Sequence, residues 1–145
     1  MTKLDILAQA IARYEGFYVT AAEAALKKIH FPTLSQRHNN PGDLMYAGQL
    51  GAIRGEQHGS GWYAKFPTVA AGWAALGRQI QLDASRGLTM SAFMNKYAPA
   101  EDSNDPKSYC AFVCGKLNVT PDTNLTDALR EPPPLEPAIV GPQPE

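Results

Sequence analysis

The sequence predicts a mainly α-helical domain of the α+β class, with five or six helices and one small β-hairpin. Apolar residues recur every three or four positions over several segments, and capping residues or prolines bound these segments. Between residues 35 and 61 this period is lost and glycine becomes frequent, which is typical of loops and a short hairpin. The 145 residues are the length of a single domain.

The first predicted helix follows Thr2 and ends at Glu15. Thr2 and Asp5, three positions apart, fit a variant of the capping box, and Gly16 suits the position just past a helix end. The apolar face of this helix is formed by Leu4, Leu7, Ala8, Ile11 and Tyr14.

Similar signals predict the later elements. Residues suited to helix N-termini are Thr20, Thr68, Thr89 and the pair Asp105-Pro106. Residues that stop or follow helices are Pro32, Gly87 and Pro99. A short helical turn is predicted near residues 125–129, and Gly59-Ser60-Gly61 predicts a chain reversal before a strand from Trp62 to Phe66.

Because the chain is Pro-rich after Arg130, we assign residues 1–130 to the folded domain and 131–145 to a flexible tail.

Composition excludes several classes of function. The formal net charge of -1 gives no basic footprint for nucleic acid, and no apolar run approaches the roughly 18 residues of a membrane span. Asp5 interrupts any candidate signal region, so we expect no secretory signal peptide. Cys110 and Cys114 are one helical turn apart and are expected to pack as free thiols, and no second Cys or His pair completes a zinc site. We expect no metal and no cofactor.

Glu15 is the strongest candidate for a catalytic residue. On a helical wheel it lies within about 40° of both Leu4 and Ile11, so its carboxyl group points toward the core. A half-buried carboxylic acid keeps its proton to higher pH, as a general acid at neutral pH must. The alternative is a side chain that rotates into solvent or pairs with an arginine. An acid at a helix end, a polar loop and hairpin, and then a helical lobe together predict a cleft between lobes with the acid at its edge.

Five short motifs occur in order between about Ile11 and Val119. They are Arg13-Tyr14-Glu15-Gly16-Phe17 with Arg37-His38-Asn39-Asn40-Pro41-Gly42-Asp43, then Tyr63-Ala64-Lys65-Phe66, then Ala71-Gly72, then Tyr97-Ala98-Pro99, then Asn104-Asp105 with Tyr109. Together they resemble a lysozyme-like family of phage and prophage peptidoglycan lytic transglycosylases. Two residues depart from that pattern, since His38 and Asp43 stand where the family has asparagines. We expect His38 to be exposed and without a ligand role.

The resemblance implies a lysozyme-like fold with an active cleft, and cleavage of the β-1,4 bond between N-acetylmuramic acid and N-acetylglucosamine. Glu15 would act as the single general acid and base, and peptidoglycan glycan strands would be the partner of a monomeric enzyme. The residues predicted to bind substrate are Asn39, Asn40, Asp43, Tyr63, Tyr97 and Tyr109.

Each of these substrate-binding residues has a structural alternative. Asn39 and Asn40 carry amides that suit acetamido groups, or they shape the turn before Pro41. Asp43 either adds a second acid or makes a turn hydrogen bond. Tyr63 stacks on sugar rings or packs in the hairpin. Tyr97 and Tyr109 pack in the core or hold Glu15 through their hydroxyl groups.

Two other functions remain open from the sequence. A hydrolytic muramidase of the endolysin type ranks second, because that pattern needs an Asp soon after the Glu and none occurs between Glu15 and His30. A catalytically silent glycan-binding or structural protein on the same scaffold ranks third. In the enzyme cases we expect synthesis in the cytoplasm and access to the cell wall in a phage virion or after holin-mediated release.

Overall fold

A computed structural model describes residues 1–97 and 105–133. This part of the chain forms seven helices and one two-stranded antiparallel sheet, so the predicted mixture of helices with a small hairpin is confirmed. In chain order the elements are α1 (Lys3–Tyr14), α2 (Ala21–Lys27), α3 (Leu34–Arg37), β1 (Ile53–His58), β2 (Gly61–Lys65), α4 (Val69–Ser85), α5 (Met90–Tyr97), α6 (Pro106–Leu117) and α7 (Leu125–Ala128).

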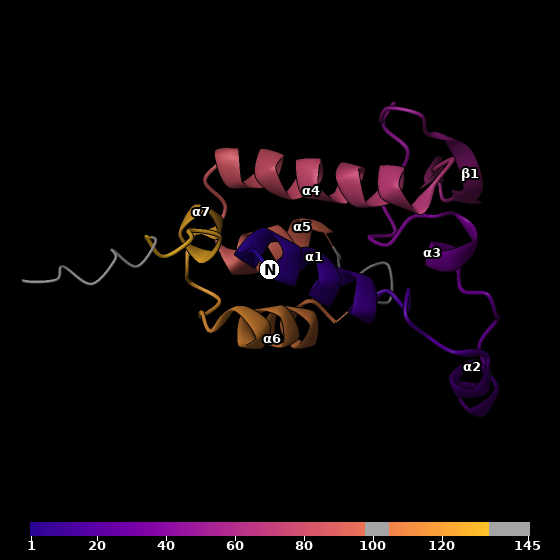
Figure 1. The fold of residues 1–145 in the computed structure, drawn as a ribbon, viewed down its shortest axis with the longest axis horizontal. Coiled ribbons are helices and arrows are strands. Elements are labelled where there is room, and N and C mark those ends of the chain that lie inside the picture. Colours follow the sequence, from indigo (N-terminus) through magenta and orange to yellow (C-terminus); the bar gives the residue numbers. More distant parts are fainter. Residues whose placement is uncertain (98–104, 134–145) are drawn as a thin grey trace, which may run out of the picture.

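The core forms around α1, which packs against α4 on one side and α6 on the other (Figure 1). α5 packs on α6 and also on α7, which in turn contacts α4. Large apolar side chains from these helices are fully buried, among them Leu7, Ile11, Leu76, Ile80, Phe93 and Val113. Full burial of one such side chain stabilises the fold by about 1.5–3 kcal/mol. The C-terminal end of α1 is therefore held firmly at the edge of the core.

The hairpin joins β1 to β2 through the reversal predicted at Gly59 and Ser60. Its register is irregular between Arg54 and Gln57. At this irregularity the backbone N–H of Glu56 donates to Nε2 of His38 over 2.9 Å. His38 is only 4 % exposed, so the expectation that it is exposed is wrong, because the hairpin folds over its ring.

The predicted number of five or six helices is too low, because α3 lies where a loop was expected. Thr33 and Gln36 form a capping box around this single turn. The amide of Gln36 also donates to the carbonyl oxygens of Phe17 at 3.0 Å and Val19 at 2.7 Å. A four-residue helix is too short to show a period, and these bonds to the segment after α1 hold it in place.

Several predictions fall on residues outside the described part of the chain: the helix stop at Pro99, the motif residues Ala98 and Asn104, and the tail from residue 134 onward.

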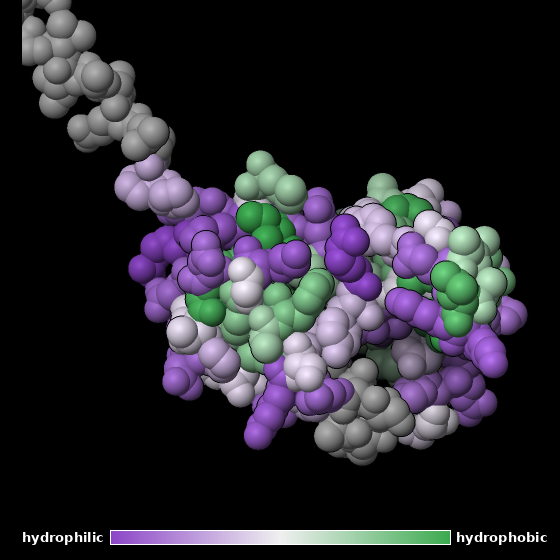
Figure 2. All heavy atoms as spheres, turned by 90° about the horizontal axis from the view of Figure 1, so that it is seen from below, coloured by the Kyte–Doolittle hydropathy of each residue, from purple (hydrophilic) through white to green (hydrophobic). Residues whose placement is uncertain are grey.

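None of the described helices is both long and apolar enough to cross a bilayer. Figure 2, seen from the side of α6 and α2, shows hydrophilic side chains interspersed with smaller hydrophobic areas. Cys110 and Cys114 are free and buried in α6, with their sulfur atoms 3.6 Å apart.

Candidate active site

Glu15 is the C-cap residue of α1 and is half-buried. Its N–H donates to the carbonyl oxygen of Ile11 over 2.9 Å, so its backbone is still held by the helix. Gly16 follows with a φ of +80°, in the left-handed region that glycine adopts without strain, and this turn ends the helix. The apolar face of α1 and the glycine after it thus place the carboxyl group at the core edge, as the sequence predicts.

The loop from Asn39 to Leu44 is held against β2 by asparagine side chains. Asn40 is fully buried, and its amide nitrogen donates to the carbonyl oxygens of Leu44 and Ala64, each over 2.9 Å. Its amide oxygen accepts the N–H of Leu44, also at 2.9 Å. The amide of Asn39 donates to the carbonyl oxygen of Phe66 at 3.1 Å. Both asparagines therefore shape the loop, and the substrate contacts expected for them remain a prediction.

The same loop packs closely on the first turn of α4. A Cβ atom at Gly72 would lie 2.0 Å from the carbonyl oxygen of Asn39 and 2.9 Å from Cδ of Pro41. Only glycine at position 72 allows the loop this approach. The contacts with β2 and α4 together fix the path of the chain up to Asp43, which has a φ of +49°.

Asp43 lies in hydrogen-bonding contact with Glu15. Burial, the charge of Glu15 and this hydrogen bond together raise the pKa of Asp43 to about 9. Burial also raises the pKa of Glu15, although the contacts with Asp43 and Tyr109 partly offset that rise. Two carboxyl groups this close cannot both ionise without strong repulsion, so the pair keeps one proton through neutral pH.

Two tyrosines complete the surroundings of the pair. The hydroxyl group of Tyr109, on α6, donates to Oε1 of Glu15 over 2.9 Å, and that of Tyr97, on α5, donates to the carbonyl oxygen of Gly42. The two rings meet edge to face with centroids 6.3 Å apart. Of the predicted site residues, Glu15, Asp43, Tyr97 and Tyr109 are therefore brought together.

Tyr63 makes a ring contact within the hairpin. It lies on β2, where its ring is tilted against that of His58 with centroids 5.0 Å apart. The structure thus places Tyr63 in hairpin packing, and the sugar contact foreseen for it remains a prediction.

A groove of about 420 Å³ opens beside the carboxyl pair. Asp43 and Tyr97 line one part of it, and the loop after Asp43 and the C-terminal half of α4 form its walls. Its polar lining includes Gln49, Gln79, Arg86 and Lys96. The groove has the size of a small-ligand site and contains several hydrogen-bonding side chains.

A buried ion cluster in this groove was not foreseen from the sequence. Asp83 is 2 % exposed and accepts hydrogen bonds from Gln79 and Arg86, each at 3.0 Å, and from Lys96. Gln79 and Asp83 of α4 and its C-cap residue Arg86 are spaced by four and three residues, which is a signal for helix-surface pairing. Nothing in the sequence places Lys96 of α5 beside them.

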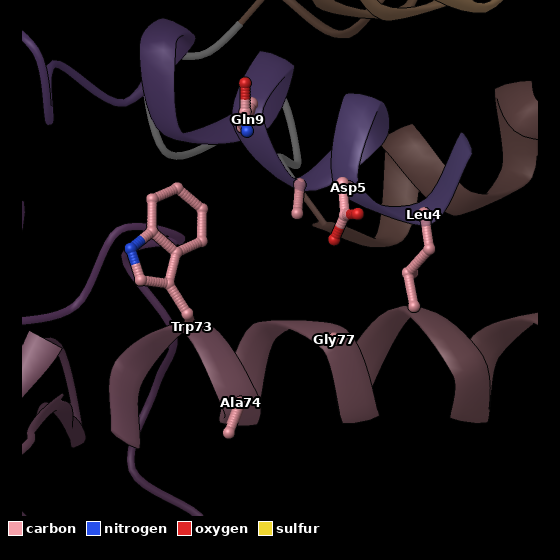
Figure 3. A pocket seen from close by; sticks show the side chains of 7 residues that line it. Leu4, Asp5, Gln9, Trp73, Ala74 and Gly77 are labelled. Atoms are coloured by element: carbon pink, nitrogen blue, oxygen red, sulfur yellow. The ribbon is translucent and has the colours of Figure 1, made fainter. Parts of the chain in front are cut away.

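A second groove lies between α1 and α4 but lacks the predicted site residues (Figure 3). Its volume is about 480 Å³, and it is lined mainly by Leu4, Asp5 and Gln9 of α1 and Trp73 of α4. Asp5 is engaged at the helix N-terminus, where it accepts the N–H of Thr2 at 3.1 Å. The groove at the opposite end of α1 is therefore the better candidate for an active site.

Comparisons with protein-family models, with curated proteins and with solved structures found no match to the chain. Among residues 1–97 and 105–133, no group of three or more His, Cys, Asp and Glu side chains is arranged to hold a metal ion. We therefore infer a function from the carboxyl pair, the two tyrosines and the groove themselves.

Proposed function

We propose that the protein is a peptidoglycan lytic transglycosylase on a lysozyme-like scaffold, with the groove beside Asp43 as its active cleft. It would cleave the β-1,4 bond between N-acetylmuramic acid and N-acetylglucosamine, with Glu15 as the general acid and base. The observation that carries the proposal is the half-buried Glu15 carboxyl group, which accepts a hydrogen bond from Tyr109 and contacts Asp43, a residue that lines the groove. Burial favours its protonated form, which a general acid requires.

The contact between Glu15 and Asp43 favours a transglycosylase over a hydrolase. Retaining glycosidases place their two carboxyl groups about 5–5.5 Å apart, and inverting ones about 6.5–9.5 Å apart, with the sugar or a water between them. Glu15 and Asp43 instead contact each other directly through their side chains. No sugar ring fits between Glu15 and Asp43, so Asp43 is not placed to attack or to activate water on the far face of the ring.

A substrate hydroxyl group supplies the nucleophile in the proposed reaction. Glu15 gives its proton to the glycosidic oxygen as the bond from that oxygen to C1 of the muramoyl residue breaks. The 6-hydroxyl oxygen of the same residue bonds to C1, and the ionised Glu15 takes the hydroxyl proton. The product has a 1,6-anhydro end and no water is consumed. General acid–base catalysis of this kind contributes about 10²–10⁴-fold to the rate.

The groove offers groups suited to a glycan. Gln49 and Gln79 carry amides that can hydrogen-bond hydroxyl and acetamido groups, and Leu44 and Met45 offer apolar surface to sugar ring faces. Glycan strands of peptidoglycan are therefore the proposed substrate. Delivery to the cell wall in a phage virion or after holin-mediated release remains part of the proposal.

Digestion of purified peptidoglycan, followed by mass analysis of the released muropeptides, tests the proposal. Anhydro ends support it, reducing ends indicate a muramidase, and binding without release indicates a silent glycan-binding protein. The Glu15→Gln variant should lose release while keeping the fold, because Gln accepts the Tyr109 hydrogen bond but cannot give up an acidic proton. Glu23→Gln, at an exposed position on α2, is the control and should stay active. Full activity of Glu15→Gln would refute the assignment of Glu15.

A further inference from the structure

The carboxyl group of Asp43 lies in an unusual environment for an ionised side chain. Its backbone N–H donates to the carbonyl oxygen of Asn40 at 3.0 Å, which helps hold the residue in the left-handed region. Its Oδ1 atom is buried, and no N–H or O–H group of residues 1–97 and 105–133 donates to it. Burial of an ionised oxygen without a donor is costly, so this environment favours a neutral carboxylic acid.

Burial raises the pKa of Glu15 as well, but its environment favours the neutral form less than that of Asp43 does, because among the described residues Oδ1 of Asp43 lacks a donor and Glu15 has one. Its Oε1 accepts the hydroxyl proton of Tyr109, and such a bond favours the ionised form of the acceptor. A single proton shared by the two carboxyl groups therefore resides on Asp43, which donates it in a hydrogen bond to Glu15. The left-handed backbone at Asp43 and the Tyr109 contact fix this arrangement from two different elements.

We propose that Asp43 stores the proton that Glu15 delivers to the glycosidic oxygen, an inference that rests on the proposed function. As the bond to C1 breaks, the proton on Asp43 passes to Glu15 and one proton passes from Glu15 to the leaving oxygen. Both carboxyl groups are then ionised, and their repulsion makes Glu15 a stronger base. Glu15 next takes the proton of the 6-hydroxyl group, and the pair returns to its single-proton state. Protons balance over one turnover, and no external acid is needed.

The charged and titratable groups around Asp43 come from α1, α3, α5 and α6, and the ion cluster of Asp83, Arg86 and Lys96 lines the same groove. Glu15 of α1 raises its pKa, and the cation of Arg37 in α3 lowers it. Tyr97 of α5 and Tyr109 of α6 keep their protons, since burial and the neighbouring carboxyl groups raise the pKa of both phenols. Arg37 is bound by Glu56, with nitrogen–oxygen distances of 2.6 and 2.9 Å, which weakens its effect on Asp43.

The Asp43→Asn variant of the full chain separates proton storage from positioning. Asn tolerates the left-handed backbone as Asp does, and its amide can still donate to Glu15, but it cannot hold a proton for the reaction. We expect the alkaline limb of the kcat/KM profile to move to lower pH by about one unit or more, because Glu15 then has to keep its own proton. An unchanged pH profile, or a shift to higher pH, would overturn the inference. Asp122→Asn, an exposed change, is the control.

A measurement without activity separates this inference from the proposed function. In wild-type protein with ¹³C-labelled aspartate, the carboxyl resonance of Asp43 should titrate near 9 rather than near its ordinary value of 3.8. In Glu15→Gln it should titrate at lower pH, since the neighbouring charge is gone. Titration near 3.8 in the wild type would overturn the inference even in an active enzyme. If Asp43 titrates near 9 but the protein releases no anhydro product, the proposed transglycosylase activity is refuted. The use of the stored proton in that reaction is then refuted as well.

Discussion

The hydroxyl group of Tyr109 donates a hydrogen bond to Oε1 of Glu15 over 2.9 Å, although the two residues are 94 positions apart in the chain. Tyr109 is fully buried, and its ring stacks on that of Tyr14 with centroids 3.9 Å apart. The orientation of the candidate acid therefore depends on how α6 packs against α1. Core packing and site geometry are linked through this one side chain.

Replacing Tyr109 by Phe should weaken both stability and catalysis. The ring and its stacking remain, but the ionised Glu15 loses a donor, so the pKa of Glu15 rises. A hydrogen bond to a charged group contributes about 1.5–3 kcal/mol, and we expect a loss of that size in unfolding free energy near pH 7. The same bond, if made in the transition state, corresponds to a roughly 10–100-fold loss in kcat/KM.

The pH dependence of the Tyr109→Phe effect has a definite sign. A carboxyl group whose pKa is raised in the folded state stabilises the fold below its unfolded pKa, and this contribution is lost as pH rises through the folded value. Because the substitution raises the pKa of Glu15 further, the loss of stability should be larger near pH 7 than near pH 4. Urea denaturation at both values measures it, with the exposed Tyr18→Phe as the control. An equal loss at both pH values would contradict the explanation.

Gly72→Ala and Gly77→Ala form a matched pair on α4. A Cβ atom at position 72 would meet the backbone of Asn39 at 2.0 Å, whereas at position 77 it would meet nothing within 4 Å. Gly72→Ala should push the Asn39–Asp43 loop away, at a cost of about 1–3 kcal/mol and with loss of the Glu15–Asp43 contact. Gly77→Ala should be neutral or more stable by up to about 1 kcal/mol, because Ala favours the helix.

Thermal denaturation and glycan release distinguish these two variants. If Gly72→Ala is as stable and active as the wild type, the loop is not held by its approach to α4. A comparable loss in both variants would indicate that the general effect of alanine on α4, rather than the contact with Asn39, is responsible.

Local signals explain why much of the fold was predictable. The spacing of Leu7 and Ile11 predicted α1, and the capping residue Thr68 with the apolar stripe after it predicted α4. The glycines around Ser60 predicted the reversal of the hairpin. The missed helix α3 carries a local signal too, since Thr33 and Gln36 have the spacing of a capping box. Its length of one turn prevented any periodic pattern.

Four predicted site residues, Glu15, Asp43, Tyr97 and Tyr109, lie together, but only the orientation of Glu15 could be derived from a helical period. The place of Glu15 follows from the period of α1, but its contact with Asp43 depends on a loop path set by long-range bonds. Asn40 fixes that path through the backbone of Leu44 and Ala64, and no local rule gives those partners. The pairing of Asp83 with Lys96 depends likewise on how α4 packs near α5.

Lys96→Met tests the role of this ion pair in holding α5 beside the groove. Burial opposes ionisation of Asp83, yet hydrogen bonds from Lys96 and Gln79 outweigh it, and the pKa of Asp83 lies below its ordinary value. Removal of one partner of a buried pair costs about 3–5 kcal/mol, and the remaining bonds from Gln79 and Arg86 should reduce this to about 1–3 kcal/mol.

The pH dependence of this loss follows from the direction of the shift. A lowered pKa means that the contribution of Asp83 is present above its unfolded pKa of 3.8 and is lost as pH falls through the folded value. The difference between wild type and Lys96→Met should therefore be largest near pH 7 and should shrink near pH 3, where a protonated Asp83 no longer needs a cation. Urea denaturation at both values measures it, and Lys27→Met on the exposed face of α2 should change stability by less than about 0.5 kcal/mol. A loss that is independent of pH would point to the packing of the lysine side chain instead of its charge.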